Sequence, residues 1–284
     1  SKYDFGVLAS DGRIYCSPCM ADKVLCIDPS TQTAYTVGSD LSFLGPHKFD
    51  GGAVVAPSGT IYCFVRKDCG VLRIIPSDQR WCKRTSLIQK DFKVDKTGDN
   101  WWYGGAVGQD GKIYYTPGGA NHVLRFDPET ESMTLLDKDL GEFGSNHKWM
   151  TCAVAANECI YAVPCHATKV LKVDTNTQEV TTIGSTLSSE EQKWHSCTLG
   201  ADGCIYGIPW NAKSILKIDP STDTVTTFGE LGEGKLKGPW RGAASGPDGC
   251  IYGIPNGAKY VLKIDPDTKT VSTIGDDLSK FGGD

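Results

Sequence analysis

Short apolar segments return along this chain at a nearly fixed interval, and each contains the tetrad Gly-x-Ile-Tyr or a near copy of it. The copies end at Tyr15, Tyr62, Tyr114, Tyr161, Tyr206 and Tyr252, so successive tyrosines are 47, 52, 47, 45 and 46 residues apart. Self-similarity at such a period indicates one structural unit built several times. The pattern therefore predicts six repeats, at approximately 2–47, 48–100, 101–147, 148–192, 193–238 and 239–284.

Within each repeat the apolar positions predict four short β segments. The first is small and apolar, as in residues 52–56, and the second is the Ile-Tyr run. The third is a Val-Leu-Lys-Ile-Asp run, and the fourth is rich in Thr and ends at Gly, as in residues 224–229. Asp-Gly pairs and Asp-Pro-x-Thr segments separate the strands, and both are turn signals. No stretch has sustained helical periodicity or enough consecutive apolar residues to cross a bilayer.

Four-stranded units of this length, repeated four to eight times, are typical of a β-propeller. We therefore predict an all-β protein, a six-bladed β-propeller with four antiparallel strands per blade, in which all 284 residues form a single domain. A linear β-solenoid is the alternative, but its rungs are usually shorter and lack the paired hairpin signals. Residues 280–283 repeat the segment that precedes the first strand, which fits either a closed ring with a docking tail or a piece of a longer protein.

Charge and cysteine content narrow the class of protein further. The net charge of −5 argues against nucleic acid as a partner. Many of the 12 cysteines are repeat equivalents, such as Cys152 and Cys197, and the blade rotation would hold these too far apart for a disulfide. The sequence has no Asn-x-Ser/Thr acceptor, no apparent secretory signal and no paired Cys-x-x-Cys motif. We therefore expect an intracellular monomer without a membrane span or a zinc site.

The loops vary between repeats more than the strands do. We call the segment that enters the first strand the leader, and the connection between the second and third strands the second loop. On a propeller both open on the same face, around the central channel. All five histidines lie in or beside them: His47, His147 and His195 at leaders, His122 and His166 at second loops. The candidate chemistry is thus concentrated at one face.

Each leader also carries an aromatic residue, which is Tyr3, Phe49, Trp102, Trp149, Trp194 or Trp240. Packing between adjacent sheets explains a ring at the same place in every blade. The residue that follows the ring changes, from Asp50 to Tyr103, Met150, His195 and Arg241, and the second loops diverge similarly. A position that differs chemically in each blade is suited to an asymmetric pocket.

A closed ring would bring His195 next to Arg241, with Trp210 and His166 nearby. Aromatic walls, a cation and imidazoles are suited to a small anionic or polar ligand. We therefore predict a binding or interaction propeller that recognises a small molecule, a glycan or a peptide. Its predicted contacts are Trp102, Tyr103, Trp149, Met150, Trp194, Trp210, Asn211, Trp240 and Asp50.

The alternative is a lyase or hydrolase, with His195 as general base, Arg241 as anion stabiliser and His166 or His147 at the channel mouth. Gly-x-Ser-x-Gly, His-Glu-x-x-His and phosphate-binding loops are absent from the sequence. No cofactor is evident, and a divalent metal is left open. A lectin-like module with one site per blade is a third interpretation, which the divergence of the loop residues disfavours.

The Gly-x-Ile-Tyr, Val-Leu-Lys-Ile-Asp-Pro and Thr-x-Thr patterns resemble those of Kelch-like, NHL-like and YncE-like propellers, and of similar repeat proteins in many unicellular algae. The resemblance covers essentially the whole chain and implies the fold rather than the function. Similar six-bladed groups include lactonase-like and strictosidine-synthase-like enzymes as well as binding scaffolds, and seven-bladed relatives include lyases of the streptogramin type. The metal-ligand pattern of the lactonase group is not matched residue by residue.

Overall fold

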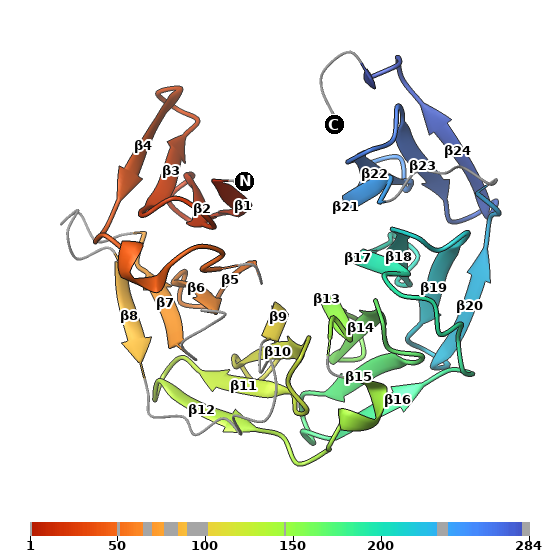
Figure 1. The fold of residues 1–284 in the computed structure, drawn as a ribbon, viewed down its shortest axis with the longest axis horizontal. Helices are drawn as coiled ribbons and strands as arrows, with labels where there is room; N and C mark the ends of the chain where they lie inside the picture. The colour runs from red at the N-terminus through yellow and green to blue at the C-terminus, as the bar shows by residue number, and fades with distance from the viewer. Residues whose placement is uncertain are drawn as a thin grey trace. The chain divides into compact units, whose positions relative to one another are not determined.

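The computed structural model describes residues 2–49, 52–64, 70–76, 85–89, 102–144, 146–231 and 238–279. In these residues the chain forms six sheets, each of four antiparallel strands in chain order (Figure 1). We number the sheets as blades 1 to 6. The prediction of an all-β protein with the six-bladed propeller fold is confirmed. The described residues contain no helix with the length and apolar character needed to cross a membrane.

The six blades have the same plan, in which each strand pairs with the next one along the chain. Blade 1 contains β1 (Tyr3–Leu8), β2 (Ile14–Pro18), β3 (Val24–Asp28) and β4 (Thr33–Val37). Blade 2 contains β5 (Ala53–Val55), β6 (Ile61–Phe64), β7 (Gly70–Ile74) and β8 (Thr85–Gln89). Blade 3 contains β9 (Trp102–Val107), β10 (Ile113–Pro117), β11 (Leu124–Asp127) and β12 (Ser132–Leu135).

The second half of the chain continues this plan, with strands of four to six residues. Blade 4 contains β13 (Trp149–Val154), β14 (Cys159–Pro164), β15 (Val170–Asp174) and β16 (Val180–Ile183). Blade 5 contains β17 (Trp194–Leu199), β18 (Ile205–Pro209), β19 (Ile215–Asp219) and β20 (Thr224–Phe228). Blade 6 contains β21 (Trp240–Ser245), β22 (Ile251–Pro255), β23 (Val261–Asp265) and β24 (Thr270–Ile274). The short 3-10 helices η1 (Ser42–Leu44) and η3 (Gly141–Phe143) precede blades 2 and 4.

The Asp-Gly turns explain why the tetrad recurs. In blade 5, Asp202 accepts hydrogen bonds from the backbone N–H of Cys204 at 3.1 Å and from the hydroxyl of Tyr206 at 2.7 Å. Gly203 between them has a φ of 77°, in the left-handed region that glycine adopts without strain. Lys217 from the third strand adds an ion pair to Asp202 at 2.9 Å. The predicted turn-forming role of this aspartate is confirmed.

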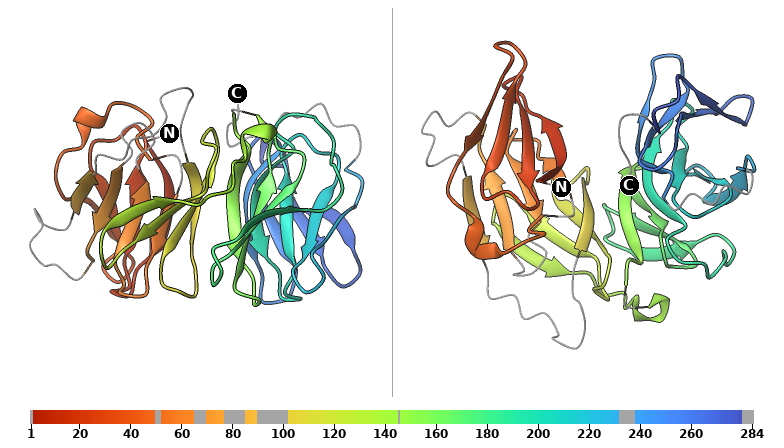
Figure 2. Two further views of the ribbon diagram at one scale, coloured as in Figure 1. Left: turned by 90° about the horizontal axis from the view of Figure 1, so that it is seen from below. Right: turned by 45° about the horizontal axis from the view of Figure 1, so that its top comes forward.

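The chain divides into two compact units, Ser1–Leu136 with blades 1 to 3 and Asp137–Asp284 with blades 4 to 6. Within each unit the sheets lie side by side in chain order, and the first strands of successive blades are in contact (Figure 2). The expectation that all 284 residues form one domain stays a prediction.

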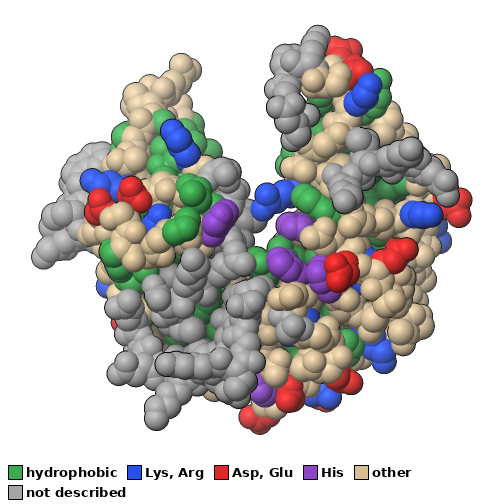
Figure 3. Space-filling view, in the orientation of Figure 1, with side chains coloured by type: hydrophobic (Ala, Val, Ile, Leu, Met, Phe, Trp, Pro, Cys, Tyr) green, Lys and Arg blue, Asp and Glu red, His purple; other side chains and the backbone are tan. Residues whose placement is uncertain are grey.

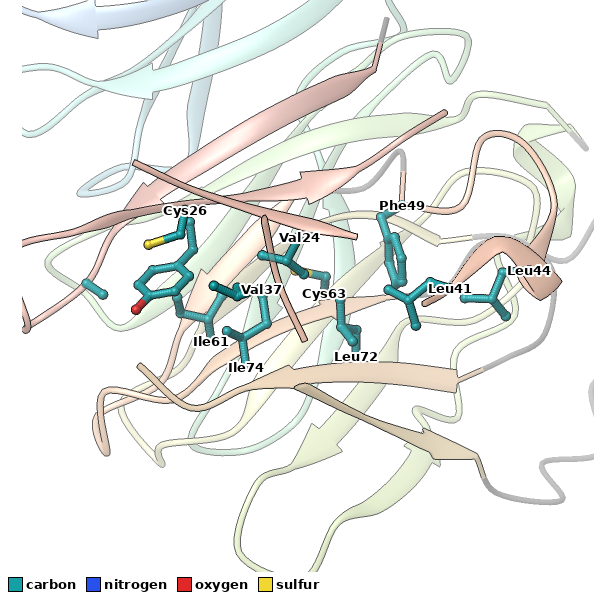
Figure 4. Packing of buried hydrophobic residues seen from close by; sticks show 12 residues of the cluster. Val24, Cys26, Val37, Leu41, Leu44, Phe49, Ile61, Cys63, Leu72 and Ile74 are labelled. Carbon is teal, nitrogen blue, oxygen red and sulfur yellow. The ribbon is translucent and has the colours of Figure 1, made fainter. Parts of the chain in front are cut away.

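The core of each unit lies between neighbouring sheets. In the first unit, Val24 and Cys26 of blade 1 pack against Ile61, Cys63 and Ile74 of blade 2 (Figure 4). Burial of each large aliphatic side chain stabilises the fold by roughly 1.5–3 kcal/mol. The ten cysteines in the described residues form no disulfide with one another, and most are buried, as the repeat positions predict. Cys69 and Cys82 lie outside the described residues.

Candidate functional site

In the blades whose second loops are among the described residues, the leader and the second loop lie at the same end, as predicted. Strand register places Trp194 opposite Pro209, so that the second loop of blade 5 begins beside the leader. The N–H groups of Trp210 and Ala212 then donate to the carbonyl of Lys193, at 2.8 and 3.2 Å. Blades 4 and 6 repeat this register. The variable residues of the two loop types therefore meet within each blade.

The leader tryptophans are structural parts of the blades. Each is buried, and each indole N–H donates to a backbone carbonyl twenty residues further on. The four pairs are Trp102 with His122 at 2.8 Å, Trp149 with Lys169 at 2.9 Å, Trp194 with Ser214 at 2.8 Å and Trp240 with Tyr260 at 3.0 Å. The N–H is the only polar group of an indole, and a buried one needs such a partner. The packing interpretation is thereby supported, and ligand contact by these rings stays a prediction.

A β-bulge follows the leader tryptophan in each blade of the second unit. The pairing of β17 with β18 shifts between Trp194 and Ser196, which makes His195 the extra residue. Equivalent shifts lie between Trp149 and Cys152 on β13 and between Trp240 and Ala243 on β21. Bulges re-aim side chains and are common next to functional sites. The residues that vary most between leaders thus occupy the irregular position of the strand, a feature that the sequence analysis missed.

His195 is mostly buried and has two basic neighbours. Its ring centroid lies 4.7 Å from that of Trp210, with the planes tilted by 31°. Burial, followed by the charges of Arg241 and His147, lowers the pKa of His195 to about 4. The imidazole is therefore neutral at pH 7, when it carries one N–H donor and one acceptor nitrogen. Thr151 of blade 4 donates to the backbone carbonyl of His195 at 3.4 Å, which helps to fix β17 against β13.

Trp210 is held by contacts from two blades. Its ring packs on His195 of blade 5 and on the backbone of Gly238, in the leader of blade 6. A Cβ atom at Gly238 would lie 2.8 Å from Cδ2 of Trp210 and closer still to two other ring atoms. Gly238 also has a φ of 60°, which favours glycine on its own account. The geometry makes Trp210 a positioning residue for His195, and its predicted ligand contact stays a prediction.

His147 and His166 form a second pair of rings in blade 4, with centroids 5.4 Å apart. Burial is the main cause that lowers the pKa of His166, so this imidazole is neutral at pH 7 as well. Its Nε2 atom is buried and has no hydrogen-bond partner among the described residues. A buried polar atom without a partner is rare in proteins, and water or a ligand often satisfies it. His147 has a φ of 47°, in the left-handed region that the equivalent leader residues His47 and Gln192 also adopt.

Two buried lysines brace these loops. The amine of Lys193 donates to the backbone carbonyls of Cys165 at 3.2 Å, His166 at 3.4 Å and Glu190 at 2.8 Å. Burial lowers the pKa of Lys193, and it lowers that of Lys148 in the preceding leader to about 8. Because Lys193 reaches back to the second loop of blade 4, it ties the two blades together. Its amine is committed to the protein.

Arg241 differs from these lysines because its side chain is exposed. Among the described residues it has no hydrogen bond or ion pair, although its charge acts on His195. Asn211, the residue after Trp210, is also exposed, and its side chain donates to the carbonyl of Glu191 at 3.3 Å. We call His147, His166, His195, Trp210 and Arg241 the histidine face. Figure 3 shows histidine side chains grouped on this side of the second unit.

The other predicted contacts lie elsewhere. Trp102 and Tyr103 are buried in the first unit, and Met150 is 9% exposed on the bulge of β13. Asp50 lies outside the described residues. No group of three or more His, Cys, Asp or Glu side chains in the described part of the chain is arranged to hold a metal ion. The four residues predicted for chemistry, His147, His166, His195 and Arg241, are the ones that the second unit brings together.

No protein-family model matches this sequence, and no curated protein is significantly similar to it. Solved structures are similar in fold. Virginiamycin B lyase from Staphylococcus aureus has a TM-score of 0.73 at 12% identity, over 96% of this chain and 83% of the other. A catalytically inactive histidine-to-alanine variant of that enzyme with quinupristin has a TM-score of 0.70 at 13% identity, over 95% and 83%. Hydrazine synthase from Kuenenia stuttgartiensis has a TM-score of 0.64 at 14% identity, over 94% and 77%.

The fold is that of a β-propeller. The predicted resemblance to YncE-like and NHL-like propellers is confirmed at this level. Identities of 12 to 14% carry no residue correspondence, and the neighbours differ in the activities that their names state. What this chain binds or transforms must be argued from the histidine face.

Proposed function

We propose that the second unit binds a small polar or anionic molecule on the histidine face. The observation that carries the proposal is the exposed guanidinium of Arg241 beside the neutral imidazole of His195. Guanidinium groups pair with carboxylate and phosphate oxygens through two parallel hydrogen bonds. The neutral imidazoles add donors and acceptors, and Nε2 of His166 is a buried polar atom without a partner in the described residues.

The pKa of His195 favours binding over general-base catalysis. A general base is most effective when its pKa lies near the working pH, and enzymes shift catalytic groups toward that value. The environment of His195 lowers its pKa from 6.5 to about 4, away from neutrality. Such an imidazole is a weak base but a good neutral hydrogen-bonding group. We therefore assign His195 to ligand recognition, with Arg241 supplying the charge.

The test is a binding screen on the whole chain, followed by matched variants. Thermal shift measurements would cover phosphate, sulfate, mono- and dicarboxylates, sialylated and neutral oligosaccharides, and acidic peptides. For any compound that binds, we expect Arg241→Gln and His195→Gln each to weaken affinity at least tenfold. Lys269→Gln removes an equal charge from the β23–β24 turn at the other end of blade 6, and Gln already occupies the equivalent left-handed position at residues 32 and 178. Binding that both site variants leave unchanged would refute the proposed face.

A lyase or hydrolase remains the second candidate, and one observation favours it. Arg241 lies close enough to act on the charge of His195, so a ligand between them would have an anion stabiliser beside a proton acceptor. The likeness in fold to virginiamycin B lyase suggests quinupristin as the first substrate to try. The measurement is mass spectrometry of the incubated compound. Turnover that His195→Ala abolishes would support the enzyme, and turnover that persists in that variant would exclude His195 as its base.

A further inference from the structure

Among the described residues, the charges that act on His195 are all positive. β21 lies against β17 at this point, where the N–H of Gly242, next to Arg241, donates to the hydroxyl of Ser196, next to His195, at 3.0 Å. The charges of Arg241 and of His147 in the leader of blade 4 both disfavour protonation of His195. Trp210 and Thr151 also contact His195, and both are uncharged. Among the described residues no carboxylate contributes to its ionisation. An imidazole in this setting lacks an opposite charge that would stabilise its protonated form.

The histidine pair of blade 4 has one acidic neighbour. Glu191 and Lys193 both act on His166, in opposite directions, while burial keeps that imidazole neutral. The amine of Lys193 is itself surrounded by three backbone carbonyls. The fixed charge of the face is therefore that of Arg241, and the neutral imidazoles of His166 and His195 can each accept a proton.

We propose that the histidine face binds a doubly charged oxyanion, and that this anion draws a proton onto His195 when it binds beside Arg241. The inference rests on the proposed function and names its ligand class. Sulfate, phosphate monoesters and dicarboxylates share the required chemistry. Arg241 neutralises one charge of such an anion, and the second charge needs a further cation within hydrogen-bond reach. We assign His195 as the group that becomes that cation, because an anion opposes the charge of Arg241, which after burial disfavours protonation of this imidazole.

Proton uptake makes binding depend on pH in a defined direction. If the anion raises the proton affinity of His195, protonation of His195 raises the affinity for the anion by the same factor. Affinity then increases as the pH falls, by about tenfold per pH unit while one proton accompanies each anion. A site in which Arg241 alone held the anion would bind an anion of fixed charge with an affinity that does not change with pH.

Sulfate is the probe for the test, because its charge stays at −2 between pH 5.5 and 7.5. Isothermal titration calorimetry would be run at constant ionic strength in two buffers that differ in ionisation enthalpy. We expect the dissociation constant to fall on acidification by up to about tenfold per pH unit, with up to one proton taken up per sulfate. Histidine resonances that disappear in His195→Gln identify His195 by NMR, and its titration should move to higher pH when sulfate is added.

Variants separate this inference from the proposed function. His195→Gln should bind sulfate weakly and with a smaller pH dependence than the unmodified protein, and Arg241→Gln should lose binding at every pH. Lys269→Gln should behave as the unmodified protein. Sulfate binding that needs Arg241 but is independent of pH would overturn the proton coupling and leave the proposed function standing. Binding that neither site variant weakens, or no anion binding at any pH, would overturn both. The NMR titration of the unmodified protein decides the question if a variant fails to fold.

Discussion

The contact between Trp210 and Gly238 leads to a stability prediction with a magnitude. In Gly238→Ala the new methyl group would lie within 2.8 Å of Trp210 Cδ2, against about 3.4 Å or more in ordinary contacts, so the indole must move. Overpacking of this kind costs about 1–3 kcal/mol. The left-handed φ of 60° adds about 1–2 kcal/mol for any residue with a Cβ. We expect Gly238→Ala to lower the free energy of unfolding by about 2–5 kcal/mol.

Gly249 supplies the control. It has a φ of 79° in the Asp-Gly turn of blade 6, and a Cβ there would meet nothing within 4 Å. Gly249→Ala therefore has the conformational cost without the collision. The difference between the two variants in urea unfolding isolates the contact with Trp210, at about 1–3 kcal/mol. Equal losses in both variants would refute the packing argument.

The same substitution tests whether Trp210 positions His195. Displacement of the indole would open the environment of His195 to water, and the pKa of His195 should then rise from about 4 toward 6.5. An NMR titration of the histidine resonances measures this shift. In Gly249→Ala the pKa of His195 should stay where it is. A pKa that also stays unchanged in Gly238→Ala would show that Trp210 has no part in holding His195.

Three further predictions concern the same unit. His195 is protonated near pH 4 in the folded chain and near pH 6.5 in the unfolded chain, so the unfolded state binds more protons between these two values. The free energy of unfolding should therefore fall by up to about 3 kcal/mol as the pH drops from 6.5 to 4. Urea titrations of His195→Gln should lack this pH dependence. Lys193→Met removes the buried amine that donates to three backbone carbonyls and should cost about 1–3 kcal/mol in chemical denaturation, whereas Lys269→Met, at an exposed position, should cost under about 0.5 kcal/mol. Trp194→Phe removes the donor to the Ser214 carbonyl and should lower the melting temperature, with an expected cost of about 1–3 kcal/mol, and an unchanged melting temperature would contradict the structural role of this indole.

The sequence predicted the sheets because their signals are local and repeated. Alternating apolar positions around Tyr206 and the Asp202-Gly203 turn specify one hairpin, and six copies specify the blade plan. The register that brings Trp194 opposite Pro209 also follows from the repeat alignment, which is why leaders and second loops were correctly expected at one end. Periodicity thus carried the fold and the end of each described blade at which the leader and the second loop meet.

Other features of the site depend on contacts between blades, which periodicity does not encode. The bulge at His195 leaves no apolar or polar mark in the sequence, because one extra residue in a leader looks like ordinary length variation. Lysine side chains are mostly exposed in proteins, yet Lys193 is buried, because backbone carbonyls of the preceding loop surround its amine. The sequence does contain one signal for the contact at Gly238. Other leaders have His or Gln in the left-handed conformation at this position, so the backbone conformation alone does not explain why the residue here is glycine.

The contacts that join blade 5 to blade 6 differ from those that join blade 4 to blade 5. This difference explains how the repeated fold acquires one distinct proposed site. At the preceding joint, the N–H of Lys193 donates to the carbonyl of Cys165 at 3.0 Å and its amine caps the same loop. Pro239 replaces the lysine at the next joint and has neither group. Trp210, which replaces Cys165, packs on Gly238 instead. At this joint an aromatic contact replaces the polar one. Trp210 thereby buries His195 beside β21, on which Arg241 is exposed. Equivalent sites in every blade would need the exchange at every joint, so the asymmetry itself argues for a single binding site rather than a multivalent lectin.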